Sequence, residues 1–241
     1  MNFANDNPYS NWGQVAAHAE TNERASFIRQ TYLHLLGAVL AFVGLEAALL
    51  NSPLGAQIYQ TLFGGENGQM GWLFVLGGFM FVSWIANRWA TSATSVGMQY
   101  AGLGLYVVAE AVIFLPLLYM ASTAGPPDVI ANAGILTAVI FCGLTAIVFA
   151  TGADFSFLRT ALSVAGFAAM GVIVCSMLFG FNLGILFTAA MIVFASSYIL
   201  YDTSNVLHHY RIGQHVAASL ALFASVALLF WYVVQLFMNR D

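Results

Sequence analysis

The sequence contains no lysine, and charged residues make up only 7% of its 241 positions. A soluble protein of this length needs a much larger charged surface, so the composition excludes the soluble globular class. The absence of lysine also excludes a retinal protein, because the chromophore of that class is attached to a lysine through a Schiff base. We therefore expect an integral membrane protein of another kind.

Residues that bind metals or form disulfides are also scarce. The two cysteines, Cys142 and Cys175, both lie in apolar stretches, and we interpret them as small buried residues rather than a disulfide or a metal site. His208 and His209 lack a third ligand at the spacing of a zinc site, so we expect them at the membrane interface. Residues 1–25 are polar and do not resemble a signal peptide; they predict a short disordered or surface-lying tail.

Apolar residues dominate what remains, at 61% of the chain. They gather in seven runs, each close to the ~20 residues that cross ~30 Å of hydrocarbon. Backbone groups inside lipid must be satisfied within the chain, so these runs are expected to be helices. The sequence thus predicts an all-α, polytopic membrane domain over residues 26–241. Its seven transmembrane helices are expected at 27–50, 71–86, 97–121, 129–150, 160–181, 184–207 and 215–238.

The arginines predict the orientation of these spans. Positive residues accumulate on the cytoplasmic side of membrane proteins. Arg240 is alone on one side of the predicted bundle, and this side is therefore expected to face outward. The N-terminus would be cytoplasmic and the C-terminus outside, and the short loops suggest the inner (cell) membrane of a bacterium. The arginines on the predicted cytoplasmic side are Arg24, Arg29, Arg88, Arg159 and Arg211.

Three carboxylates lie inside the predicted spans. Glu46 is near the outer end of the first, Glu110 is in the middle of the third, and Asp202 is toward the cytoplasmic end of the sixth. An ionisable side chain at this depth costs roughly 2.5–3.5 kcal/mol on insertion scales, so it usually faces a bundle interior or a water-filled cavity. We expect the three to form a descending acidic series that favours cations, with a pH-sensitive passage.

Each of these residues also has a structural interpretation. Asp202 either lines a pathway, pairs with Arg88, or is solvated at the interface. Glu110 could instead be a protonated packing residue, and Glu46 could extend to the outer surface. Arg88 is either a cytoplasmic anchor of its span or a latch on Asp202. His34, on an apolar face, is expected to be a hydrogen-bonded core residue.

The stretch around Asp202 resembles a known family. SYILYDT at residues 197–203, followed by an apolar last span, is similar to the transmembrane Bax-inhibitor-motif family, also called the Bax inhibitor-1 family. DFSFL at 154–158 resembles the family's linker between spans four and five, and RQTYLHLL at 29–36 resembles its entry into the first span. The resemblance covers roughly residues 27–238 and points to a bacterial-type member.

This resemblance implies a seven-helix bundle with the last helix central. Members of the family are associated with a pH-dependent calcium leak and, in eukaryotes, with suppression of cell death. A pair of aspartates on the last two helices forms their pH sensor, and an arginine on the second helix can latch the pore. Asp202 matches the first aspartate and Arg88 the arginine, but Ser225 occupies the position of the second aspartate. A di-aspartyl sensor is therefore absent, and Glu110 or Glu46 would have to substitute.

Two functions follow from these expectations. The first is a passive, pH-influenced calcium or cation leak, with Ca²⁺ held weakly at Asp202 as the permeant ion. The second is a non-transporting regulator that binds another membrane protein, such as a membrane protease complex. No enzyme activity, nucleic acid or cofactor is expected. Tyr201-Asp202 has the YD of aspartyl membrane proteases, but the GxGD that should follow it is missing.

Overall fold

The computed structural model describes residues 13–63, 68–92 and 95–239, and the regular elements in these ranges are helices, apart from an isolated β-bridge between Val15 and Arg211. Seven of its helices are long and apolar enough to cross a membrane, which confirms the predicted class. An additional short helix, α2, lies in the link between the first two spans. The elements are η1 (Ala16–His18), α1 (Thr21–Leu50), α2 (Pro53–Phe63), α3 (Gly68–Ala90), α4 (Val96–Ala124), α5 (Val129–Thr151), α6 (Leu158–Phe179), α7 (Ile185–His208) and α8 (His215–Met238).

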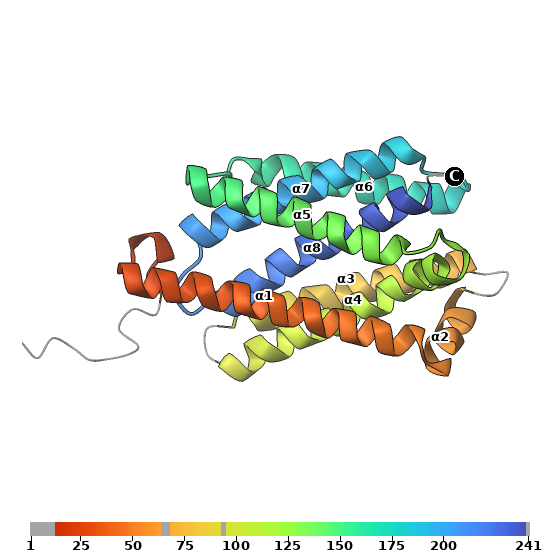
Figure 1. Cartoon of the computed structure of the whole chain (residues 1–241), viewed down its shortest axis with the longest axis horizontal. Coiled ribbons are helices and arrows are strands. Elements are labelled where there is room, and N and C mark those ends of the chain that lie inside the picture. Colours follow the sequence, from red (N-terminus) through yellow and green to blue (C-terminus); the bar gives the residue numbers. More distant parts are fainter. Residues whose placement is uncertain (1–12, 64–67, 93–94, 240–241) are drawn as a thin grey trace, which may run out of the picture.

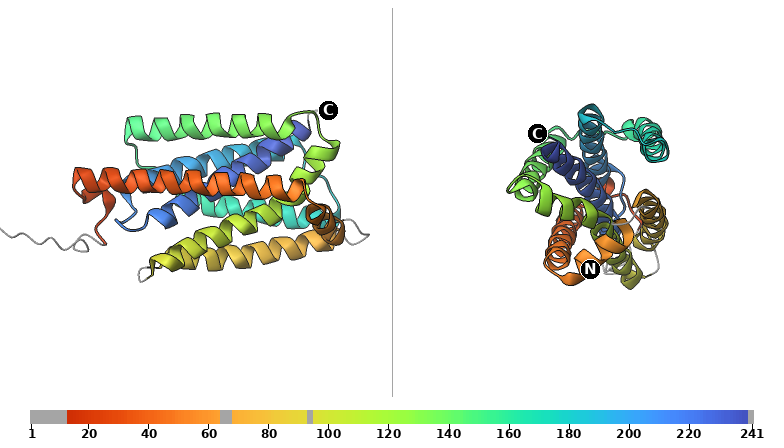
Figure 2. Two further views of the ribbon diagram at one scale, coloured as in Figure 1. Left: turned by 60° about the horizontal axis from the view of Figure 1, so that its bottom comes forward. Right: turned by 90° about the vertical axis from the view of Figure 1, so that its right-hand side faces the viewer.

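The last helix is the centre of the bundle (Figures 1 and 2). α8 packs against α1, α3, α4, α5 and α7, as the family resemblance implies. In the most apolar window of each helix, 61% of α4 and 50% of α8 is buried, against 6% of α6. α6 is peripheral because it packs along α7 and makes no comparable packing with another described helix. The interior is thus built around α4 and α8.

The helix α4 approaches α3 very closely. Gly102 makes this possible, because a Cβ atom at this position would lie 2.6 Å from the backbone of both Ala86 and Ala90. Small residues at a helix contact let two backbones come together where lipid provides no hydrophobic drive for packing. The position of α3, and of the side chains that it directs into the bundle, therefore depends on this glycine.

The polar N-terminal segment differs from the expected tail. α1 begins at Thr21, earlier than predicted, and the residues before it are packed. Ala16 is fully buried, and its N–H donates to the Tyr210 carbonyl at 2.8 Å. The N–H of Ile212 donates to the Gln14 carbonyl at 2.9 Å. Residues 14–16 are thus bound to the loop between α7 and α8, whereas residues 1–12 lie outside the described part of the chain.

The distribution of arginines between the two ends of the bundle agrees with the distribution predicted from the sequence. Figure 1 shows the start of α1, the start of α4, the α5–α6 link and the α7–α8 link at the same end of the bundle. Arg24 lies in the first turn of α1, Arg88 in the last turn of α3, Arg159 in the first turn of α6 and Arg211 in the α7–α8 link. Arg240 lies outside the described residues. We call the end that carries the four arginines the arginine end.

The two cysteines do not have the buried positions that were expected. Cys142 and Cys175 are both free and exposed on the outer surface of the bundle. Small, weakly polar thiols are well tolerated against lipid, and an apolar run gives no indication of which of its faces points inward.

Candidate functional site

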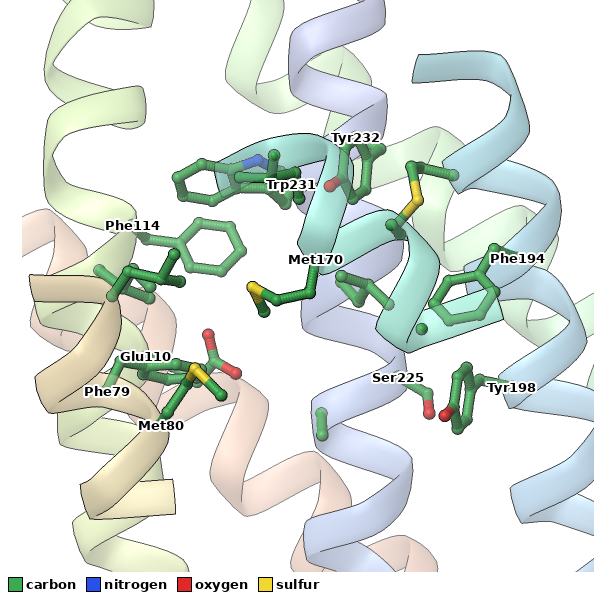
Figure 3. A pocket seen from close by; sticks show the side chains of 18 of the residues that line it. Phe79, Met80, Glu110, Phe114, Met170, Phe194, Tyr198, Ser225, Trp231 and Tyr232 are labelled. Atoms are coloured by element: carbon green, nitrogen blue, oxygen red, sulfur yellow. The ribbon is translucent and has the colours of Figure 1, made fainter. Parts of the chain in front are cut away.

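A cavity of about 740 Å³ lies inside the bundle, between α3, α4, α6, α7 and α8. Figure 3 shows aromatic rings and methionine side chains on several sides of it. Three polar residues singled out from the sequence reach it: Glu110, Asp202 and Ser225. Five helices from separate parts of the chain thus place the predicted polar residues on one internal surface.

Asp202 and Ser225 form a direct contact between α7 and α8. The Ser225 hydroxyl donates a hydrogen bond to the Asp202 carboxylate at 2.5 Å, and the two residues are 4% and 7% exposed, respectively. The two helices are sequential and antiparallel, with only a short loop between them, so the positions come together across their contact. The serine at the position of the second aspartate thus contacts Asp202 directly. It leaves one carboxylate where a di-aspartyl sensor would have two.

Glu110 approaches the same cavity from α4. It is 5% exposed, and its carboxyl group points into the open space in Figure 3. The hydroxyl group of Tyr106, one turn earlier, is hydrogen-bonded to it. Tyr106 lines the cavity but was not predicted from the sequence, although its i, i+4 spacing to Glu110 is the signal that could have identified it.

Glu46 lies apart from these two carboxylates. It is 4% exposed, but it does not belong to the cavity lining. Within the described residues neither of its carboxyl oxygens has a hydrogen-bond partner. The expected three-carboxylate series is therefore wrong at this position, as is the alternative in which Glu46 extends to the surface. Helical periodicity locates a residue on its own helix, but it does not specify which neighbour the helix face meets.

Arg88 does not latch Asp202 in this structure. Its side chain is exposed at the arginine end, and no ion pair with Asp202 is found within the described residues, whereas His209 pairs with Asp154. Asn87, the residue before Arg88, lines the cavity. The arrangement fits the interpretation of Arg88 as an anchor at the end of its span.

The linker between α5 and α6 is fastened to the end of α7. The Asp154 carboxylate accepts hydrogen bonds from the Ser156 N–H at 2.9 Å, from the Ser204 hydroxyl at 3.3 Å and from His209 Nε2 at 3.1 Å. The bond from the Ser156 backbone is the main cause that lowers the pKa of Asp154 to about 2, and His209 adds to it. His208 Nε2 donates to the Gly152 carbonyl at 3.1 Å. The DFSFL stretch thus connects the α5–α6 linker to the end of α7, in part through Ser204, which is two residues after Asp202.

His34 is hydrogen-bonded, but it is not a core residue. Its Nε2 is 2.8 Å from the Tyr100 hydroxyl, and its Nδ1 is 2.6 Å from the Gln30 carbonyl. The side chain is half-buried in a surface groove between α1 and α4, where its ring lies 4.9 Å from that of His215. The expectation of a buried position is wrong, because a polar residue near the end of a span can reach its partners at the surface.

The described residues offer little to a tightly bound metal ion. They contain no group of three or more histidine, cysteine, aspartate or glutamate side chains that could hold one. Calcium prefers about six to eight oxygen ligands, and Asp202 already accepts the hydrogen bond from Ser225. A calcium ion at Asp202 would depend on water and on neighbouring oxygens, so it fits this site as a passing substrate.

Comparison with known proteins agrees with this architecture. The family model described as "Inhibitor of apoptosis-promoting Bax1" matches residues 24–241. The chain belongs to the Bax inhibitor-1 family. An uncharacterized protein of Pseudomonas aeruginosa is 30% identical over 223 residues, which cover 92% of this chain and 93% of that protein. The resemblance carried by SYILYDT is thereby confirmed, and this Bax inhibitor-1 family chain has Ser225 opposite Asp202.

Proposed function

We propose that the protein provides a passive leak for cations, with calcium among them, through the internal cavity and past Asp202. The observation that carries this proposal is that Glu110 and Asp202, each more than nine-tenths buried, lie on the wall of one cavity inside a membrane-spanning bundle. Carboxylates inside a membrane are costly and usually mark an ion or substrate pathway. Acidic lining favours cations over anions.

The cavity extends along α8 toward the end opposite the arginines. Trp231 and Ser225 both line it, and six residues of helix separate them, which corresponds to about 9 Å along the axis. On the other side of Asp202, toward the arginine end, the interior is filled by Val206, Leu207 and Val216. The structure is therefore closed at this end, and conduction requires the end of α7 to move away from the start of α8.

The small number of oxygen ligands that the cavity offers to a cation is consistent with transport. A pathway must bind an ion well enough to admit it and loosely enough to release it. Two carboxylates at separate positions, together with hydroxyl groups and water, provide such intermediate affinity. Protons compete with cations for the same carboxylates, so we expect flux to increase with pH.

Calcium flux into proteoliposomes between pH 5 and pH 8 tests the proposal. We expect the variants Asp202→Asn and Glu110→Gln to reduce the flux by about tenfold, because each removes a charge that compensates the desolvation of the cation. Glu46→Gln is the matched control, because it neutralises a carboxylate that is equally buried but outside the cavity. No flux from folded wild-type protein, or an equal loss in all three variants, would contradict the leak.

One observation favours the alternative, a regulator that does not transport. The cavity is closed near Asp202, and the hydroxyl of Ser225 donates a hydrogen bond to one of the two carboxylate oxygens of Asp202. A bundle without flux could still bind a membrane protein partner such as a protease complex. Stable co-purification with a partner, together with absent flux, would support this function instead.

The proposed location is the inner membrane of a bacterium, with the N-terminus in the cytoplasm and the C-terminus outside. The four arginines gathered at one end of the described bundle support this orientation.

A further inference from the structure

The internal cavity is larger than a cation pathway requires. A water molecule occupies roughly 30 Å³ of liquid, whereas this cavity has about 740 Å³. Sites for drug-sized ligands typically have about 300–1,000 Å³ and are mostly apolar, with a few polar groups that fix the orientation of the ligand. The volume and the apolar walls therefore suit an organic molecule better than a hydrated ion.

The charge of the cavity has one sign. Glu110 and Asp202 are the carboxylic acids in its wall, and no arginine or histidine among the described residues lines it. A buried carboxylate is stabilised by a cation placed beside it, and an anion in the same position would be repelled. The wall is thus complementary to a ligand that is apolar and positively charged.

Aromatic rings form much of the wall on the α3, α4 and α8 sides of the cavity. The rings of Trp72 and Trp231 stack at 5.7 Å, and Phe114 meets Trp231 edge-on at 5.0 Å. On the opposite side, Phe194 and Tyr198 are 5.0 Å apart. Aromatic faces attract organic cations, most strongly when the cation is desolvated. The aromatic groups and the carboxylate therefore provide the two elements that recognise such cations.

Methionines make the remaining wall adaptable. Met170 extends from α6 toward the middle of the space, and Met80 lies on the facing helix α3 (Figure 3). Methionine side chains are flexible and polarizable, and they are common at binding surfaces that accept ligands of several shapes. Since Met80 is 52% exposed, the cavity reaches the outer surface of the bundle beside α3.

This opening faces the bilayer. α6 packs along α7, and within the described residues it makes at most a weak contact with α3, so the space between α3 and α6 is not closed by helix packing. A molecule dissolved in the membrane can therefore enter from the side without first crossing an aqueous vestibule.

We propose that this cavity is a binding site for lipophilic organic cations that enter from the bilayer, with Glu110 as the counter-ion and the surrounding aromatic rings as the apolar contact. The proposal does not depend on calcium flux, because binding is measured without it. If the leak also exists, such a cation would block it by occupying the same space.

The test uses tetraphenylphosphonium and tetraphenylborate, which have the same shape and opposite charges. The purified full chain is reconstituted in phosphatidylcholine nanodiscs, and binding is measured by equilibrium dialysis against empty nanodiscs. We expect saturable binding of the phosphonium and none of the borate. Glu110→Gln should weaken phosphonium binding about tenfold or more, because it removes the buried partner charge. Glu46→Gln should leave it unchanged.

A second variant tests the location independently of charge. Ala224 lines the cavity from α8, and Ala224→Trp would fill part of it. We expect this variant to abolish phosphonium binding while it remains monodisperse. Equal binding of both ions would overturn the charge recognition. Wild-type affinity in both Glu110→Gln and Ala224→Trp would overturn the site, as would an absence of saturable binding to wild-type protein.

Discussion

At the scale of single residues, Asp202 and Ser225 determine how this chain differs from the aspartate pair of its family. Two carboxylates in one buried position would repel each other and share a proton, so their titration would be coupled. A serine donates a hydrogen bond and carries no charge, so Asp202 lacks this coupling. Any pH dependence of the protein must then come from Asp202 and Glu110 titrating as separate groups, or from ionisable groups outside the membrane.

Asp154 is the group outside the membrane for which a pH effect can be worked out. Its pKa is lowered from 3.8 to about 2 in the folded protein, mainly by the Ser156 N–H and further by His209. A pKa that is lower in the folded than in the unfolded protein stabilises the fold at pH values above the unfolded pKa. For Asp154 this contribution is lost as the pH falls from about 4 through 2. The side chain is 44% exposed, so the effect should be small.

We therefore expect Asp154→Asn to lower the melting temperature slightly at pH 7, and this difference from wild type to shrink below pH 4. Thermal unfolding in detergent across pH 2 to 7 measures it. Asp128→Asn, at the surface loop before α5, is the control for the loss of a surface carboxylate elsewhere in the chain. A difference that stays constant down to pH 2 would show that the Asp154 charge does not fasten the linker.

The site was only partly predictable from the sequence. The contact of Asp202 with Ser225 could be anticipated, because the family resemblance places Ser225 at the position of the second aspartate of the pair. The separation of Glu46 from Glu110 could not, because it depends on how α1 is rotated against α4 and α8. Long-range packing determines that rotation, and the apolar pattern of α1 is too uniform to reveal it.

At the scale of helices, hydropathy predicted the seven spans to within a few residues at most ends. It missed α2 because this helix is short and lies in a link that contains glycine and proline. It placed the start of α1 too late because the first turns of α1 are polar and lie beyond the apolar run. Hydropathy detects the part of a helix that suits lipid, and it does not report the polar turns that continue outside it.

The contact between α3 and α4 gives a prediction at this scale. Gly102→Ala would place a methyl group 2.6 Å from the backbone of Ala86 and Ala90, so α3 would have to move. Overpacking of this kind costs about 1–3 kcal/mol. We expect the melting temperature in detergent to fall by several degrees.

Gly104 provides the matched control on the same helix. A Cβ atom there would meet no atom within 4 Å, so Gly104→Ala should leave stability unchanged or slightly raise it through the higher helix propensity of alanine. Equal melting temperatures for the two variants would mean that the close contact at Gly102 does not hold α3 in place.

At the scale of the whole molecule, the sequence predicted a seven-span bundle with a central last helix, but it did not predict the large internal cavity. A cavity is what remains when five helices fail to fill the space between them, so it is a property of their joint arrangement. The aromatic and methionine residues of its wall are indistinguishable in sequence from those that face lipid or fill a core. Only its carboxylates were conspicuous.

The orientation of the whole bundle is the last prediction. Seven spans place the two ends of the described chain on opposite sides of the membrane, and the arginines assign the arginine end to the cytoplasm. Cys142 and Cys175 are first replaced by alanine, which their exposed positions should tolerate. In this background, a membrane-impermeant maleimide should label Asn239→Cys in intact spheroplasts, and it should label Thr91→Cys only after lysis. The reverse pattern would invert the orientation, and labelling of both before lysis would contradict an odd number of spans.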